Sequence, residues 1–361
     1  MDESGLVRIV VSSRMDDDRP VYVSGSFCNW DPCNPDYLMK KIGKGIYQFE
    51  FVNHFNTENT LEYKYTKGGW DHVELDIFGN TSKNRTIKSQ EIVSNDFVPL
   101  WRKNGFTPFH KKSMPKVEVL SENFLIPQLD RTRKIVVLLP SDYYKNTEKH
   151  YPVVYMHDAQ NLFGEGSAYG NWEIDKRLSL LKEHGKSEVI IVAINHGEED
   201  RQTEFSPYKN KVKGQGMKYA NFIVRTLKPE IDKIYRTKPE RQFTGTGGSS
   251  MGGLISIYAG MMYPETIGRL MVFSPSLWTS PKIYFDAVEF FNPLDTKIYL
   301  YGGGKESHSM LPNLEKLKTT IENQGFDSNK IQIKAELDPE GLHNEKRWGQ
   351  EFPKALDWLY C

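Results

Sequence analysis

The sequence predicts an α/β protein in which a small all-β domain precedes a mostly parallel sheet covered by helices. From residue 6 to about residue 93, strand-like segments alternate with clusters of Asn, Asp, Pro and Gly. After about residue 117, short apolar runs alternate with longer amphipathic stretches. The chain has 361 residues, which is long for a single domain of average size, so two domains are expected.

The first domain is expected over residues 1–93. Its strand-like segments are short and regularly spaced, which is typical of a small antiparallel, immunoglobulin-like sandwich. These segments read LVRIVV, RPVYVSGSF, GIYQFEFV and LEYKYTKGGW. Residues 94–116 contain three prolines and no sustained period, so we expect a linker there.

The second domain is expected over residues 117–361. Continuous runs of Val, Ile and Leu indicate strands buried on both faces, at 134–140, 152–158, 188–195, 269–275, 297–303 and 330–337. Amphipathic stretches predict helices at 173–183, 215–235, 252–262, 309–324 and 345–360. Strands that alternate with helices in this way predict a mostly parallel sheet with a helix between successive strands.

Charge and cysteine content narrow the possible functions. Lys plus Arg and Asp plus Glu number 47 each, so the overall field gives no case for binding nucleic acid or an anionic membrane. The three cysteines form neither a disulfide framework nor a zinc pattern, and we expect no metal and no organic cofactor. Cys28 and Cys33 either pair in an oxidising compartment or remain free thiols.

The amino terminus, MDESGLVRIVV, lacks the basic and apolar regions of a signal peptide, and no apolar stretch of 18 residues occurs. We therefore expect no membrane span. The compartment stays open: cytoplasmic by default, or secreted if a leader has been removed.

A Gly-x-Ser-x-Gly motif, formed by Gly248, Ser250 and Gly252, lies within the segment GTGGSSMGG. RQFTGT reads as a strand that enters the motif, and MGGLISIYAGMMYP reads as an apolar helix that leaves it. A sharp strand-to-helix turn of this kind presents a serine nucleophile in α/β-hydrolases, because small neighbours let the backbone bend tightly. We therefore expect Ser250 to be the nucleophile of an α/β-hydrolase.

A serine nucleophile needs a base, and the base needs an acid that orients it. His308 and His343 are the two histidines after Ser250, and His343 follows the last expected strand, where this fold places its base. Glu306 follows the strand at 297–303 and is the favoured acid. Asp338 is the chief competitor, while Asp295 precedes that strand.

The negative charge of the tetrahedral intermediate requires backbone N–H donors. Met251, directly after the nucleophile, is expected to supply one of them. The second is expected from the loop HDAQNLF at residues 157–163, with Gln160 as the candidate.

Residues 117–361 resemble the esterase D family, which includes feruloyl esterases, S-formylglutathione hydrolases and enterochelin esterases. The resemblance rests on VVYMHDAQNLF, NWEID, INHGEEDRQTEFSPY, GGSSMGG, YGGGKES and GLHNEKRW, which appear in the order of the family. It implies that Ser250, Glu306 and His343 form a triad. It also implies substrate-binding or supporting roles near the pocket for Trp172, Asn195, Arg201 and Glu204.

The first domain resembles the starch- and glycogen-binding modules that are fused to amylases and branching enzymes. The matching text is VYVSGSFCNWDP, LEYKYTKGGWDHVE and GNTSKNRT. By this resemblance Trp30, Lys64, Trp70 and Asn84 would hold glucan, since sugar rings stack on flat aromatic rings. The alternative is a sandwich with a purely structural role.

Together these observations predict a serine esterase that acts through an acyl-enzyme on a small-molecule or oligosaccharide ester. An acetylated or feruloylated carbohydrate is favoured because a sugar-binding-like module precedes the catalytic domain. One alternative is a siderophore-ester hydrolase of the enterochelin type, and another is a non-catalytic glucan-binding or scaffold protein.

Overall fold

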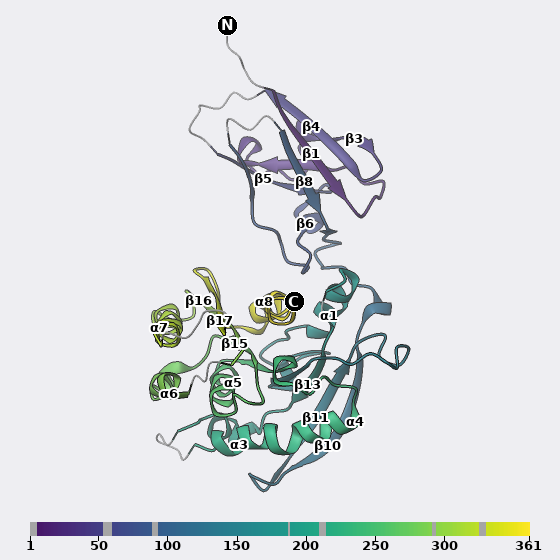
Figure 1. Cartoon of the computed structure of the whole chain (residues 1–361). Coiled ribbons are helices and arrows are strands. Elements are labelled where there is room, and N and C mark those ends of the chain that lie inside the picture. Colours follow the sequence, from purple (N-terminus) through teal and green to yellow (C-terminus); the bar gives the residue numbers. More distant parts are fainter. Residues whose placement is uncertain are drawn as a thin grey trace. The chain divides into compact units, whose positions relative to one another are not determined.

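The computed structural model describes residues 6–52, 60–88, 93–186, 188–208, 214–290, 294–324 and 330–361. The chain divides into two compact units, Met1–His110 and Lys111–Cys361. This division falls inside the segment that was expected to be a linker. Figure 1 shows the elements of each unit.

The first unit is built from short strands. One sheet has the order β3-β4-β1-β8, a second has the order β2-β5-β7, and β6 pairs with β9. Apolar side chains of both larger sheets form one core, in which Ile9, Val23 and Tyr65 have no exposed surface. The strands are β1 (Leu6–Ser13), β2 (Tyr22–Gly25), β3 (Lys40–Gly43), β4 (Ile46–Val52), β5 (Leu61–Thr66), β6 (Glu74–Leu75), β7 (Arg85–Ile87), β8 (Val93–Val98) and β9 (Leu100–Trp101).

The first unit extends beyond residue 93, where the sequence predicted its end. Strand β8 pairs with β1 in parallel, so the sheet is not purely antiparallel as expected. Val98 and Trp101 are buried in the core of this unit, and the Trp101 indole donates a hydrogen bond to the Ser13 hydroxyl at 2.8 Å. The first residues of the expected linker, through Trp101, therefore belong to the fold of the first unit.

The second unit contains an eight-stranded sheet with the order β10-β11-β13-β12-β14-β15-β16-β17. The β10–β11 and β11–β13 pairs are antiparallel, and all other neighbours are parallel. Strands β12, β13 and β15 are buried along their whole length, which explains why nearly all of their residues are apolar. The strands are β10 (Lys116–Ile126), β11 (Arg131–Leu139), β12 (Val153–His157), β13 (Ile190–Ile194), β14 (Thr244–Ser249), β15 (Arg269–Phe273), β16 (Thr296–Gly303) and β17 (Ile331–Asp338).

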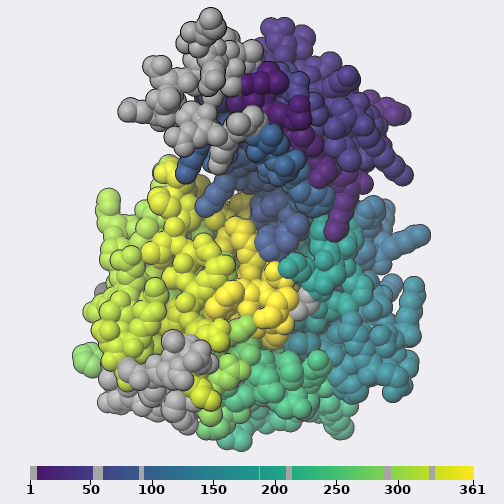
Figure 2. Space-filling model, turned by 45° about the horizontal axis from the view of Figure 1, so that its top comes forward, coloured from purple at the N-terminus to yellow at the C-terminus, as the bar shows by residue number. Residues whose placement is uncertain are grey.

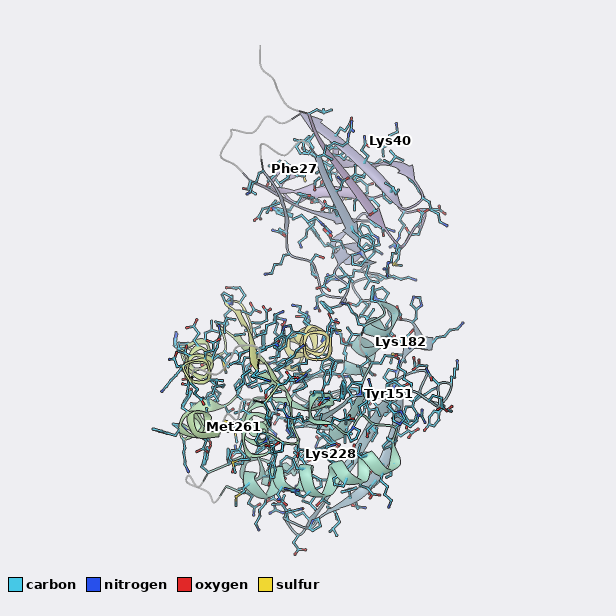
Figure 3. The ribbon with its side chains drawn as sticks, viewed as in Figure 1. Phe27, Lys40, Tyr151, Lys182, Lys228 and Met261 are labelled. Carbon is cyan, nitrogen blue, oxygen red and sulfur yellow. The ribbon has the colours of Figure 1, made fainter. Side chains whose placement is uncertain are left out.

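Helices cover both faces of this sheet (Figure 1). Helices α1 and α8 pack against each other on one face, while α3, α5, α6 and α7 follow one another along the other face. Side chains fill the space between the sheet and its helices (Figure 3). The helices are α1 (Ile174–Glu183), α2 (Arg201–Glu204), α3 (Gly216–Phe222), α4 (Lys228–Ile234), α5 (Met251–Met262), α6 (Ile283–Phe290), α7 (Met310–Glu322) and α8 (Glu345–Tyr360).

Four features of the second unit differ from the sequence prediction. Strand β10, the short helix α2 and helix α6 were not predicted. The helix expected over 215–235 is divided into α3, a π-helical segment Ile223–Leu227 and α4. Pro229 follows the π-helical segment, and its ring nitrogen cannot donate the hydrogen bond that a regular turn would need.

The parallel strands bring distant parts of the sequence to one edge of the sheet. Ser250 follows β14, Glu306 lies three residues after β16, and His343 lies between β17 and α8. The segments after β16 and β17 are in contact, because the N–H of Lys305 donates to the Gly341 carbonyl at 3.1 Å. Figure 2 draws the carboxyl-terminal part of the chain in yellow-green to yellow.

Over the described ranges, no helix is long and apolar enough to cross a bilayer. The same residues contain no group of three or more His, Cys, Asp or Glu side chains placed to hold a metal ion. Cys28 and Cys33 are free thiols, so the disulfide considered above is not formed.

Candidate active site

Ser250 lies at the sharp turn between β14 and α5. Its backbone has φ 56° and ψ −120°, a conformation that non-glycine residues rarely adopt. The turn is fixed on both sides, because the N–H of Ser250 donates to the Phe273 carbonyl at 2.9 Å and its carbonyl accepts the N–H of Ser276 at 3.1 Å. Strain held in this way is common at functional sites.

The glycines around Ser250 in the segment GTGGSSMGG lie in close contacts that leave little room for a side chain. A Cβ atom at Gly253 would lie 2.9 Å from the Phe273 carbonyl oxygen, and one at Gly252 would lie 3.2 Å from a carboxylate oxygen of Asp158. A Cβ at Gly248 would lie 3.1 Å from the carbonyl carbon of Gly252. A side chain at Gly253 would therefore push the turn away from β15, whereas one at Gly248 or Gly252 would require its neighbours to shift slightly.

His343 and Glu306 are in direct contact. The distance from His343 Nδ1 to Glu306 Oε2 is 2.6 Å, and the Glu306 side chain is only 2% exposed while that of His343 is 35% exposed. The imidazole also meets the Trp348 indole edge-on, with 4.7 Å between ring centroids. The Glu306 carboxylate thus occupies Nδ1 of His343, so Nε2 is the ring nitrogen that is left for another partner.

The competing residues have other partners. Asp338 Oδ2 accepts a hydrogen bond from Arg347 Nε at 2.8 Å, and this contact lowers the pKa of Asp338 against the opposing effect of burial. Asp295 pairs with Arg269 at the opposite end of β16. His308 is exposed. Among the described carboxylates considered for the role, Glu306 is therefore the one that contacts His343.

Two serines after β15, which the sequence analysis did not single out, contact members of the site. Ser276 Oγ lies 3.1 Å from Ser250 Oγ, and the Ser274 hydroxyl donates to Glu306 Oε1 at 2.6 Å. Both serines are almost fully buried. The sequence FSPS at the end of a buried strand could have indicated these two serines, since the end of that strand lies beside the nucleophile turn in a parallel sheet.

Met251 and Gln160 were expected to flank the oxyanion. Met251 is the first residue of α5, where a backbone N–H has no acceptor within the helix. Gln160 lies in the short helical turn Ala159–Asn161 after β12, and its side-chain oxygen accepts the N–H of His196 at 3.2 Å. Both residues are thus placed in the turns where donors were expected.

The loop after β12 is anchored by a partly buried ion pair. Asp158 has φ 58° and accepts two hydrogen bonds from Arg201, from Nε at 2.7 Å and from Nη2 at 2.8 Å. Arg201 also lies over the ring of Phe205, 5.2 Å from its centroid. Arg201 therefore holds this loop in place, and Asp158 balances its positive charge.

His157 supports the same loop from within the core. It is 1% exposed, with Nδ1 at 3.1 Å from the Tyr219 hydroxyl and Nε2 at 3.3 Å from the Thr246 hydroxyl. Burial lowers the pKa of His157 to about 4, although Asp158 acts in the opposite direction. This histidine is therefore neutral near neutral pH and has a structural role.

Two of the residues expected to have substrate-binding or supporting roles lie in the core. Trp172 is 2% exposed and stacks on Phe273 with 5.4 Å between ring centroids. Glu204 is fully buried and accepts hydrogen bonds from Arg131 and Arg133 of β11. A substrate cannot reach buried side chains that are already paired or stacked, so only the supporting role fits Trp172 and Glu204.

Asn195, the remaining expected substrate-binding residue, directly follows β13. It is half-buried, and its backbone N–H donates to the Lys134 carbonyl at 3.2 Å. It therefore lies at the same carboxyl edge of the sheet as the loops described above.

In the first unit, the four residues expected to bind glucan come together. They line a surface hollow in which the Trp30 and Trp70 rings are tilted by 43°, with centroids 6.4 Å apart. The Lys64 ammonium donates to the Ser82 carbonyl, and Asn84 donates to Glu62 at 2.9 Å. The lining residues are Trp30, Lys64, Trp70, Val73, Thr81, Asn84 and Arg102.

The second unit matches a known protein family. A sequence profile of the family described as Putative esterase matches residues 126–359. The chain belongs to this family. It is a carboxylic ester hydrolase with the α/β-hydrolase fold.

Two curated proteins match different shares of the chain. Uncharacterized protein YbbA of Bacillus subtilis (strain 168) is 24% identical over 243 residues, which cover 63% of this chain and 92% of that protein. An alpha-amylase of Niallia circulans is 32% identical over 85 residues, which cover 24% of this chain and only 6% of the amylase.

Two of the solved structures that share the fold illustrate the likeness. A ferulic acid esterase from Anaeromyces mucronatus has a TM-score of 0.55 at 20% identity, covering 70% of this chain and 94% of that one. The enterobactin esterase from Shigella flexneri has a TM-score of 0.54 at 13% identity, covering 98% of this chain and 92% of that one. At these identities the likeness concerns the fold alone.

Proposed function

We propose that this esterase cleaves its substrate through an acyl-enzyme on Ser250, with His343 as base and Glu306 as the acid that orients it. His343 takes the Ser250 hydroxyl proton as Oγ attacks the ester carbonyl carbon, and it then gives that proton to the departing alcohol oxygen. In the second half-reaction His343 takes a proton from water, whose oxygen attacks the acyl carbon. The acid product then leaves and Ser250 regains its proton.

The observation that carries this proposal is the 2.6 Å contact between His343 Nδ1 and Glu306 Oε2. A carboxylate on Nδ1 holds the proton on that nitrogen, so Nε2 carries a lone pair that can accept the serine proton. The strained turn at Ser250 supports the same roles, because it exposes the hydroxyl at the edge of the sheet that also bears Glu306 and His343.

The tetrahedral intermediate would be stabilised by backbone donors of two turns. The N–H of Met251 at the start of α5 is one, and its position at a helix amino terminus favours negative charge. The turn that contains Gln160 supplies the other, held in place by Asp158 and Arg201.

For the substrate we propose an acylated carbohydrate, such as an acetylated or feruloylated oligosaccharide. The hollow lined by Trp30 and Trp70 supports a sugar ligand, since paired aromatic rings beside polar groups suit the apolar faces and hydroxyls of sugars. The match to an amylase points to the same class of ligand. The first unit would then bring the enzyme to a glucan-containing material.

A second candidate is an ester of an anionic catecholate siderophore. The enterobactin esterase named above favours it, because its likeness extends over nearly the whole chain, including the first unit. An anionic substrate needs cationic side chains, however, and Arg201 beside the site is already neutralised by Asp158. We therefore place this candidate second.

A substrate panel tests the proposal. The wild-type protein and Ser250→Ala are assayed on acetylated and feruloylated oligosaccharides, on the corresponding methyl esters and on a triscatecholate ester. We expect the highest kcat/KM on an acylated sugar and loss of that activity in Ser250→Ala. A clear preference for the triscatecholate ester would instead establish the second candidate.

A further inference from the structure

Glu306 is held by two donors in addition to its contact with His343. Oxygen Oε1 accepts the N–H of Gly303 at 2.6 Å and the hydroxyl of Ser274 at 2.6 Å, whereas Oε2 faces His343. A carboxylate that is held only at Oε2 could rotate about its last side-chain bond. The two donors on Oε1 restrict that rotation.

The direction of the Ser274 hydroxyl is itself determined. The indole Nε1 of Trp348 donates to Ser274 Oγ at 2.9 Å. An indole N–H only donates, so the serine oxygen acts as acceptor there and its single proton is available for Glu306. Trp348 is 3% exposed and is packed between Trp172 and the His343 ring, which keeps its N–H in place.

The backbone of Ser274 is strained for a residue other than glycine. Its φ is 45°, it has no exposed surface, and its N–H donates to the Tyr301 carbonyl at 2.7 Å. Glycine would adopt this conformation without steric cost. A serine at such a position, with its hydroxyl in two hydrogen bonds, indicates that the side chain has a task that glycine could not perform.

We propose that Ser274 is a positioning residue of the esterase site, which orients the Glu306 carboxylate so that Oε2 stays aimed at His343 Nδ1. The inference rests on the proposed function, in which Glu306 orients the base. Ser274 acts through Glu306 and not on the substrate, so its loss should slow turnover and leave KM nearly unchanged.

Ser274→Ala and Ser274→Gly test this inference with a soluble nitrophenyl ester. Each variant removes one hydrogen bond to a charged group, for which we expect kcat to fall about 10- to 100-fold with KM changed less than about twofold. Glycine is the matched control, since it also removes the hydroxyl but relieves the backbone strain. Wild-type kcat in Ser274→Ala would overturn the inference, and so would wild-type kcat in Ser274→Gly alone.

A double-mutant cycle with Glu306→Ala shows whether Ser274 acts through Glu306. Once the carboxylate is absent, Ser274→Ala should lower kcat/KM by less than about twofold further, because residues that act as one unit are not additive. A loss of the same size in both backgrounds would mean that Ser274 acts independently of Glu306, and the inference would be wrong.

Thermal unfolding of each variant establishes that it is folded. If the Ser274 variants do not fold, Trp348→Phe provides the test, since it removes the N–H that directs the Ser274 hydroxyl, together with the five-membered ring of the indole, and keeps an aromatic ring beside His343. We then expect a loss of kcat without a change in KM, and an unchanged kcat would reject the role of Ser274. Ser250→Ala is assayed in parallel: activity retained there would overturn the proposed function itself, whereas a failure confined to Ser274 would not.

Discussion

His343 Nδ1 lies 2.6 Å from Glu306 Oε2, while Asp338, much closer to His343 in sequence, is paired with Arg347. The base and its carboxylate partner therefore come from the segments after two neighbouring strands, β16 and β17. This arrangement fixes the orientation of the imidazole. The carboxylate occupies Nδ1, and Nε2 is available for proton transfer.

Glu306→Gln and Asp338→Asn should differ strongly in their effect on catalysis. An amide at position 306 no longer holds the Nδ1 proton, so we expect kcat to fall about 10³-fold or more. Asp338→Asn removes a partly exposed ion pair, for which we expect nearly unchanged kcat and a stability loss below about 1 kcal/mol. Steady-state kinetics of the two variants provides the comparison, and a greater loss of kcat in Asp338→Asn would assign the acid to Asp338.

Ser276→Ala should make Ser250 less reactive. The Ser276 hydroxyl lies 3.1 Å from Ser250 Oγ, and its loss removes a hydrogen bond between two neutral groups. We expect the second-order rate of inactivation by a fluorophosphonate to fall about 2- to 10-fold. Ser280→Ala, another buried serine of the same loop, is the control and should react like the wild type. Equal rates for Ser276→Ala and the wild type would show that this contact has no effect on reactivity.

Acid should destabilise the second unit through His157. Burial lowers the pKa of His157 to about 4 in the folded protein, whereas an unfolded histidine has its usual value of about 6.5. Between these two pH values the unfolded chain binds a proton that the folded chain does not, so the free energy of unfolding falls as pH falls. The loss attributable to this group is on the order of 3 kcal/mol between pH 6.5 and pH 4.

Urea unfolding at several pH values in this window measures that loss. His157→Gln should be less stable than the wild type at pH 7, because contacts with Tyr219 and Thr246 are altered. Its stability should nevertheless depend less steeply on pH. Parallel curves for the two proteins would show that His157 does not cause the acid sensitivity.

Trp30→Ala and Trp70→Ala should separate glucan binding from hydrolysis. Each removes one aromatic wall of the hollow in the first unit, so we expect at least about a tenfold weaker retention on insoluble starch. Hydrolysis of a small soluble nitrophenyl ester should be unchanged. Equal retention of both variants and the wild type would show that the first unit does not bind glucan through Trp30 and Trp70.

The sequence was sufficient to locate the strands that are buried on both faces. β12, β13 and β15 are apolar at nearly every position because neither face meets water. β10 was missed because it is an edge strand with mixed burial, in which Val117 and Val119 are each 50% exposed. An edge strand of this kind has neither a continuous apolar run nor a regular alternation.

It was also predictable that Ser250, Glu306 and His343 lie at one edge of the sheet, since each follows a strand whose carboxyl end reaches that edge. The contacts within the site were not predictable. The pairing of Asp338 with Arg347, the burial of Glu204 between two arginines of β11 and the stacking of Trp172 all depend on packing across elements. Sequence spacing carries no information about such contacts.

Covalent labelling identifies the nucleophile, on which the whole proposed mechanism depends. The protein is treated with a fluorophosphonate, digested, and the modified peptide is sequenced by mass spectrometry, with Ser250→Ala as the control. We expect a single phosphonylated residue, Ser250, and no labelling in the variant. Labelling at another serine, or unchanged labelling of Ser250→Ala, would contradict it.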